Sequence, residues 1–171
     1  MIKITGALMI LLATSWIGFE LSRRYAERSS QLRLLRSALQ SLEAEIMYGH
    51  APLHEASRRI AKQLRAPVSE LFAAFAGKLL QKDTTVKDAW EESLSEVWKR
   101  TALEKNEYEI LRQFGETLGK HDKIQQQKQI ILALTHLERE EKEAREKQAA
   151  YGKIMKSVGF LSGLLAVILL L

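Results

Sequence analysis

The sequence predicts an all-α protein, namely a compact six-helix bundle flanked by an N-terminal and a C-terminal transmembrane helix. Two uncharged ends point to this class, because charged residues make up 27% of the 171-residue chain and none of them lies in either end run. Between the ends, apolar residues recur at the helical spacing of three and four almost throughout. The interruptions are short, so we expect successive helices to pack as antiparallel neighbours.

The first uncharged run is Ile4–Phe19, a stretch of 16 residues that Glu20 and Leu21 extend. A bilayer core of ~30 Å requires ~20 helical residues, so residues 1–21 are predicted to form a transmembrane helix. A secretory signal peptide is the alternative, since Ala13-Thr14-Ser15 offers a loose cleavage site. The apolar run continues past that site through Trp16 and Phe19, which favours the membrane helix.

The second uncharged run is Ser157–Leu171, which Ile154 and Met155 extend if Lys156 reaches the interface. Its last residues, LLAVILLL, leave no polar face for water, so residues 154–171 are predicted as a transmembrane helix rather than a core helix. Gly159 and Gly163 are four residues apart and form a candidate helix-packing face. The alternative is that glycine is simply common in membrane helices. A true packing face would join the two segments or two copies of the chain.

The placement of Lys and Arg predicts the orientation. On the terminal side of the two runs there is one cationic side chain, Lys3. On the body side, cationic side chains flank both runs: Arg23, Arg24, Arg28, Arg33 and Arg36 after the first, and Lys142, Arg145, Lys147, Lys153 and Lys156 before the second. By the positive-inside rule, the body of residues 22–153 faces the cytoplasm. This orientation and attraction to anionic lipid explain much of the net charge of +5 without a nucleic-acid partner.

The first two helices of the body are predicted from one stripe and two breaks. The first helix continues from the membrane to about Tyr48, and Gly49 ends it. Pro52 opens the second helix. The apolar residues expected to face partner helices are Leu32, Leu35, Leu39, Leu42 and Ile46 in the first, and Leu53, Ala56, Ile60 and Leu64 in the second.

Three further helices are predicted to follow. Pro67 starts the third, a capping-box-like Thr85-Val86-Lys87-Asp88 starts the fourth, and Asn106 is expected to cap the fifth with Glu109 in its first turn. Their expected apolar faces are Val68, Leu71, Phe72, Phe75 and Leu79; Val86, Trp90, Leu94 and Val97; and Tyr108, Leu111, Phe114 and Leu118.

The sixth helix is predicted to start near Asp122 and to run toward the second membrane segment, carrying Ile124, Ile131, Leu134 and Leu137. Ten of the sixteen residues from Glu138 to Lys153 are charged, which is too many to face a core. We therefore expect a solvated stalk that pairs with residues 22–33 and holds the bundle away from the bilayer. A protein-docking surface is the alternative.

No recognisable catalytic, cofactor or metal motif is present, and the chain contains no Cys. His50 and His54 are separated by Pro52, so they do not share a regular helical turn as a zinc-binding pair would. The segment from Gly115 to Lys120 is one residue short of a P-loop, and no strand precedes it. The sequence thus predicts a protein that is not an enzyme.

Several segments in order resemble the stage III sporulation protein AB family of endospore-forming bacteria. The resemblance rests on residues 39–53 (LQSLEAEIMYGHAPL), on residues 115–119 (GETLG), on the two terminal runs and on the length. It covers essentially the whole chain.

The body is also similar to the cytoplasmic domain of the F-type platform proteins of type II secretion and type IV pilus machines. Their Gly-Glu-x-x-Gly signature is matched by Gly115, Glu116 and Gly119, and a Pro-Leu at the start of the second helix is matched by Pro52 and Leu53. We expect these residues to be structural, with the glycines allowing a neighbouring helix to come close. Platform proteins carry the domain twice, whereas this chain has no internal repeat, so a platform would require at least two copies.

The resemblance implies a non-enzymatic scaffold, without a cofactor, in the sporulation channel complex between mother cell and forespore. The implied partners are a P-loop ATPase of the same operon, ring-forming channel subunits and the lipid bilayer, with no nucleic acid. The implied location is the mother-cell membrane around the forespore, with the central domain cytoplasmic. The alternative function is a membrane-tethered regulator or a nucleic-acid-binding helical module that uses Arg23–Arg36.

Overall fold

The computed structural model describes residues 2–119 and 123–170, and for most of residues 2–21 and 152–170 it describes the backbone alone. Its elements are α1 (Ile2–Tyr48), α2 (Leu53–Gln63), α3 (Val68–Lys78), α4 (Val86–Trp98), α5 (Lys105–Thr117) and α6 (Lys123–Leu170). No strand occurs within these residues. The predicted all-α class and the six helices are therefore confirmed.

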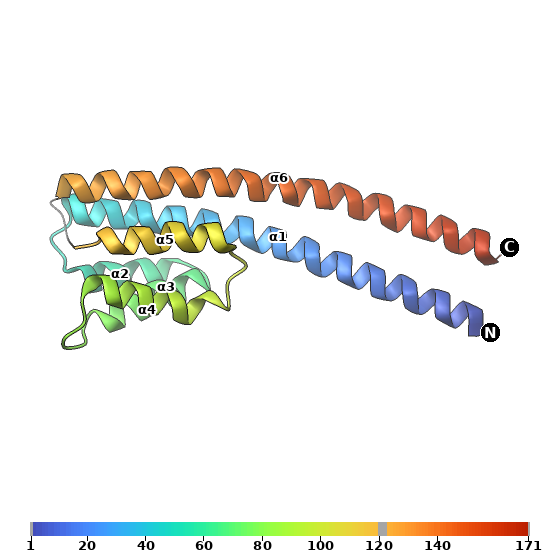
Figure 1. Cartoon of the computed structure of the whole chain (residues 1–171), viewed down its shortest axis with the longest axis horizontal. Helices are drawn as coiled ribbons and strands as arrows, with labels where there is room; N and C mark the ends of the chain where they lie inside the picture. The colour runs from blue at the N-terminus through green and yellow to red at the C-terminus, as the bar shows by residue number, and fades with distance from the viewer. Residues whose placement is uncertain (1, 120–122, 171) are drawn as a thin grey trace.

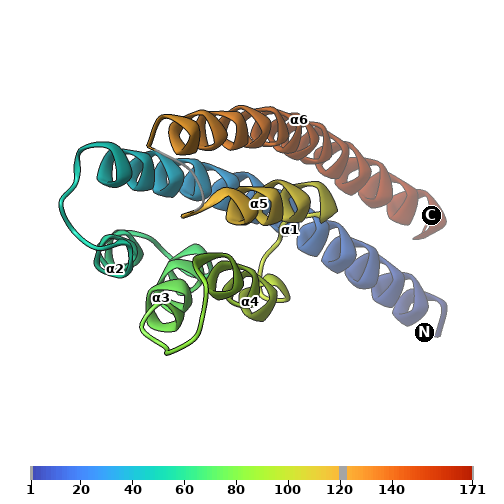
Figure 2. The ribbon, with the colours of Figure 1, turned by 60° about the vertical axis from the view of Figure 1, so that its left-hand side comes forward.

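The fold consists of two long helices, α1 and α6, and four short ones, α2 to α5. Figure 1 shows α1 and α6 side by side, with α2 to α5 gathered along one half of their length and the other halves extending as a pair of arms. Both chain ends lie at the tips of these arms. Figure 2 shows α5 beside α6 and α4 beside α5, with α3 packed between α4 and α2, and α2 in turn contacts α1.

The two predicted transmembrane helices, 1–21 and 154–171, are not separate elements, because they continue α1 and α6 without a break. For most of these residues, Gly159 and Gly163 among them, the structure describes the backbone and not the packing around it. In the part of the chain that is described, no helix has a stretch both long and apolar enough to cross a bilayer.

The core forms where the predicted apolar faces meet. Leu32, Leu35, Leu39 and Leu42 are fully buried, as the stripe on α1 predicts, and Ile46 packs at the edge of the core. At the centre, Trp90 donates its Nε1–H to the carbonyl oxygen of Leu111 across 2.7 Å. Its ring meets three phenylalanine rings edge-on, with centroid distances of 5.1 to 5.8 Å, namely those of Phe72, Phe75 and Phe114.

The helix starts agree in part with the sequence predictions. Thr85 caps α4, because its hydroxyl accepts the backbone N–H of Asp88 across 3.1 Å. The predicted Asn106 cap of α5 is wrong, since the N-cap is Glu104, whose backbone N–H donates to Glu107 Oε2 across 2.7 Å. Tertiary contacts of Glu107 with α1 decide this start against the local preference for Asn.

The predicted buried face of α6 is right for two residues and wrong for two. Leu137 is buried and Leu134 packs against the core, whereas Ile124 and Ile131 are 62% and 48% exposed and Ile130 and Ala133 are buried instead. The charged segment 138–153 is also not a fully solvated stalk, because Glu140 and Glu141 are buried. The reason is that α1 supplies arginines opposite these two carboxylates.

Candidate functional site: a charged seam and the groove at its end

The predicted pairing of residues 22–33 with the charged part of α6 is built around Arg28. Its side chain is 2% exposed, and its Nε donates to Glu107 Oε1 across 2.8 Å while Nη2 donates to Glu140 Oε2 across 3.2 Å. Glu107 and Glu140 are 0% and 2% exposed. One buried guanidinium on α1 therefore holds one buried carboxylate from α5 and one from α6. We call these three residues the buried triad.

The sequence contains a signal for the buried triad. Arg28 lies four residues before Leu32, so it continues the stripe of Leu32, Leu35 and Leu39 at the same alternation of four and three. Glu140 likewise follows Leu137 by three residues on α6. A charged residue in register with a buried stripe indicates an internal ion pair. Arg28 was instead counted among the cationic residues that determine the orientation in the membrane.

A second ionic cluster joins Arg36, two turns after Arg28 on α1, to Glu141, the residue after Glu140 on α6. Arg36 Nη1 donates to Glu141 Oε2 across 2.6 Å, and Arg145 reaches the same carboxylate from α6. Glu141 is 3% exposed, whereas Arg36 and Arg145 are partly and largely exposed. Both clusters join α1 to α6, so the arms leave the body at a defined register.

Aromatic and exposed charged groups continue the seam toward the arms. The rings of Tyr25 and Tyr151 stack at a centroid distance of 4.4 Å. Hydrogen bonding to Tyr151, with burial in addition, raises the pKa of Tyr25. On α6, the hydrogen bond with Lys147 lowers the pKa of Glu143, and the same bond raises the pKa of Lys147. These pairs are consistent with the charged pattern predicted for residues 138–153.

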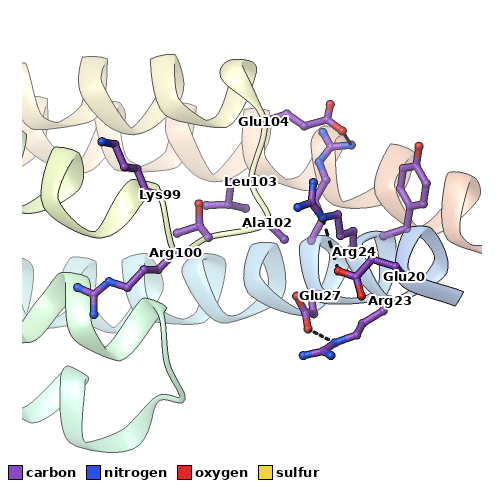
Figure 3. A pocket seen from close by; sticks show the side chains of 12 residues that line it. Glu20, Arg23, Arg24, Glu27, Lys99, Arg100, Ala102, Leu103 and Glu104 are labelled. Atoms are coloured by element: carbon purple, nitrogen blue, oxygen red, sulfur yellow. Dashed lines mark hydrogen bonds and ion pairs between the residues drawn. The ribbon is translucent and has the colours of Figure 1, made fainter. Parts of the chain in front are cut away.

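A groove of about 630 Å³ lies at the end of the body from which the arms extend. Figure 3 shows its two walls, the start of the charged part of α1 and the α4–α5 connection. The connection is fixed to α1 because the backbone N–H of Ala102 donates to Gln31 Oε1 across 2.9 Å. Five cationic and three anionic side chains line the groove: Arg23, Arg24, Arg28, Lys99 and Arg100, and Glu20, Glu27 and Glu104.

Of the two glycines of the platform-like signature, Gly115 is buried against Trp90, whereas Gly119 is exposed and lies beside Val86. Gly115 is in α5, and a Cβ at this position would overlap Trp90 Cδ1. Gly119 follows α5 with a φ of +75°, a left-handed conformation that favours glycine, and a Cβ there would lie 3.2 Å from Val86 Cγ2. Glu116 is 41% exposed and accepts from Arg112 Nη1 across 2.8 Å.

The Pro-Leu pair starts α2. Pro52 is the N-cap residue, and its carbonyl oxygen accepts the backbone N–H of Glu55 and of Ala56. Leu53 packs against the core. The pair therefore sets the direction in which α2 leaves α1, and no reactive group lies between it and the glycine signature.

The histidines do not converge. His50 lies in the connection before α2, His54 in α2 and His136 in α6, while His121 is outside the described residues. Among the described residues, no group of three or more His, Asp or Glu side chains is placed to hold a metal ion.

Comparison with known proteins gives three consistent matches. The family model described as "Stage III sporulation protein AB" matches residues 3–171. A Bacillus subtilis (strain 168) protein of that name is 58% identical over 171 residues, covering 100% of both chains. A solved structure of stage III sporulation protein AB is 60% identical and has a TM-score of 0.70, and the match covers 72% of this chain and 98% of the other.

Proposed function

This chain belongs to the stage III sporulation protein AB family, and we propose that it acts in spore formation as a non-enzymatic membrane platform. In this role the body docks a cytoplasmic P-loop ATPase, and the arms meet ring-forming channel subunits in the complex that links mother cell and forespore. The protein would reside in the mother-cell membrane around the forespore, with the body of residues 22–153 on the cytoplasmic side.

The observation that carries this proposal is the pair of parallel arms. The helices α1 and α6 leave the same end of the body side by side, and each continues into one of the two uncharged runs of the sequence. Two apolar helix ends at one end of a charged body suit a protein that is anchored twice in one membrane and presents its body on one side.

Exposed apolar side chains on the described part of the arms support the anchorage. Trp16 and Phe19 on α1 are 78% and 71% exposed, and Ile154, Val158 and Leu161 on α6 are more than half exposed. Large apolar groups without protein partners are stabilised in lipid, and Trp is favoured at the membrane interface.

The buried seam supports a scaffold rather than a catalyst. The charged groups of the buried triad are all used to join α1, α5 and α6. A mechanical force applied to the body is therefore transmitted to both arms through these contacts. In this proposal a separate ATPase supplies the energy, and the body transmits or anchors. Glu107 and Glu140 are held by Arg28, and neither of them lines the groove.

Two copies of the chain would make the two-domain arrangement of a platform protein. Association through the small residues Gly159 and Gly163 would bring the arms of two copies together. Replacing both glycines with Leu is expected to weaken self-association in crosslinking of membranes. Unchanged crosslinking would remove this packing face from the proposal.

The alternative, a nucleic-acid-binding module, is less favoured because most of the arginines it would use are paired with glutamates. Arg28 is buried in the triad, and Arg36 is paired with the buried Glu141. Arg23 and Arg24 pair with glutamates on their own helix, which leaves fewer cationic groups to contact phosphates. The alternative requires steeply salt-dependent DNA or RNA binding by the body.

The test is affinity purification with crosslinking from sporulating cells that carry a tagged chain. We expect a P-loop ATPase and ring-forming subunits to co-purify in detergent. A matched variant with charge reversal at the exposed Lys82, in the α3–α4 connection, serves as the control for non-specific loss. Recovery of the chain without any ATPase or channel subunit would contradict the platform, and salt-sensitive nucleic acid in the sample would favour the alternative.

A further inference from the structure

The groove at the base of the arms contains a buried donor that lacks a proper acceptor. Arg28 lines the groove, and its Nη1 atom is buried without a hydrogen bond of acceptable geometry. Only Glu104 Oε1 approaches it, at 3.3 Å, from a side chain that is 50% exposed. A buried guanidinium N–H without a good partner costs free energy, and an acceptor entering the groove would recover it.

Three other cationic groups of the groove, Arg23, Arg24 and Lys99, can accept an anionic partner from solution. Arg24 lies 3.9 Å from Glu20, and Arg23 pairs with Glu27, all four side chains being largely exposed. Exposed pairs of this kind contribute little, so a competing anion can replace the carboxylate. Among the described ion pairs none involves Lys99, which lies on the opposite wall of the groove (Figure 3).

The position of the groove along α1 determines which anion meets it. Glu20, the first charged residue after the uncharged run, lines the groove, and Arg28 follows it by eight residues, which is about 12 Å along a helix. If the run spans the hydrocarbon core, these residues lie at the depth of the lipid headgroups and just beyond, since that layer is about 5 to 8 Å thick on each side.

We infer that the groove between residues 20–28 of α1 and the α4–α5 connection binds the phosphate group of an anionic phospholipid. Arg28 is paired with Glu107 and Glu140, and Arg100 with Glu70, so these two cations are largely compensated. The donors that an entering phosphate meets are therefore Arg24 on one wall and Lys99 on the other, with Arg28 Nη1 beside them. A guanidinium can donate two parallel N–H bonds to two oxygens of a phosphodiester. An anionic phospholipid presents this phosphate without a neighbouring choline cation, which would be repelled by the arginines. The inference rests on the membrane anchorage of the proposed function.

Lipid binding in the groove would also orient the body relative to the membrane. A lipid held between α1 and the α4–α5 connection would fix the tilt of the body against the membrane surface, because that connection is itself bonded to α1 through Gln31. The groove thus presents a defined face of the body to cytoplasmic partners.

The experiment uses the full chain purified in detergent micelles and titrated with dioleoyl phosphatidylglycerol or dioleoyl phosphatidylcholine, with bound lipid counted by native mass spectrometry. We expect the phosphatidylglycerol complex to be selectively retained. The variant Arg24→Gln with Lys99→Gln removes two groove cations and should weaken phosphatidylglycerol binding by about tenfold or more. The control, Arg33→Gln with Lys82→Gln, removes two exposed cations outside the groove and should bind as the original chain does.

Three results would overturn the inference. These are equal binding of the two lipids, equal phosphatidylglycerol binding by the groove variant, and complete displacement of the lipid by inorganic phosphate, which would identify a free-anion site. Circular dichroism of each variant separates a lost site from a lost fold. Retention in carbonate-washed membranes reports anchorage separately, so a chain that stays in the membrane without lipid selectivity contradicts the groove and leaves the platform intact.

Discussion

Arg28 of α1 and Glu107 of α5 form a hydrogen-bonded ion pair across 2.8 Å, although 79 residues separate them and neither side chain is more than 2% exposed. Such a pair is more costly to break than to omit, because removal of one partner leaves an uncompensated buried charge. The pair lies where the body joins the arms, so its loss should destabilise the packing of the body and of the adjoining arms.

The variant Arg28→Met should therefore lower the free energy of unfolding by about 3 to 5 kcal/mol, since Glu107 and Glu140 would remain buried without their cation. Urea unfolding followed by circular dichroism measures this change. Arg23→Met is the matched control, because its exposed pair with Glu27 contributes only about 0 to 1 kcal/mol. Equal effects of the two variants would contradict a buried ionic seam.

A triple variant provides a further check on the buried triad. Arg28→Met combined with Glu107→Gln and Glu140→Gln removes the stranded charges along with the cation, so it should be more stable than Arg28→Met alone. The comparison uses the same unfolding measurement. A triple variant less stable than the single one would show that the cost of Arg28→Met comes from lost packing.

Two glycines in helices give opposite predictions. Gly115→Ala should destabilise the body by about 1 to 3 kcal/mol, because its Cβ would overlap the ring of Trp90 in the centre of the core. Gly77→Ala is the control, since a Cβ there meets nothing within 4 Å, and better helix propensity should raise stability by up to about 1 kcal/mol. Thermal unfolding of both variants decides this, and destabilisation of similar size at the two positions would refute the packing role of Gly115.

The leucine stripe and the turn residues were sufficient to predict the buried face and the end of α1. Leu32, Leu35, Leu39 and Leu42 are all buried because a spacing of three and four places them on one face of a helix, and Gly49 with Pro52 prevents that helix from continuing. The buried face of α6 was harder, because Ile130 and Ile131 are both apolar and only the packing against α1 selects Ile130.

The seam could be predicted only in outline. Local sequence favours Asn106 as the helix cap, but Glu107 is held by Arg28 from α1, a contact between residues far apart in the chain. Buried carboxylates in a charged segment cannot be read from the segment alone, because their burial depends on cations supplied by another helix. The exposed side of the same segment, including Glu143 and Lys147, agrees with the pattern of charges four residues apart.

The tyrosine pair predicts a pH effect. Hydrogen bonding to Tyr151 raises the pKa of Tyr25 above the value of about 10 expected in the unfolded chain. The resulting stability is present in full below about pH 10 and is lost as the pH rises through the higher pKa of the folded state. In Tyr151→Phe, ultraviolet titration should show Tyr25 ionising at lower pH, and Tyr48→Phe, which removes a 78% exposed ring, should leave Tyr25 unchanged. An identical titration of Tyr25 with and without the Tyr151 hydroxyl would show that this hydrogen bond has no such effect.

The central claim is that α1 and α6 carry the body on one side of a membrane, and single cysteines test it most directly because the chain contains none of its own. The measurement is labelling of Lys3→Cys and Lys82→Cys with a membrane-impermeant maleimide in intact and opened bacterial cells that express the chain without sporulating, so that the outer side of its membrane faces the medium. We expect Lys3→Cys to react in intact cells and Lys82→Cys to react only after the cells are opened. Labelling of both cysteines only in opened cells, with the chain recovered in the absence of detergent, would contradict the membrane platform.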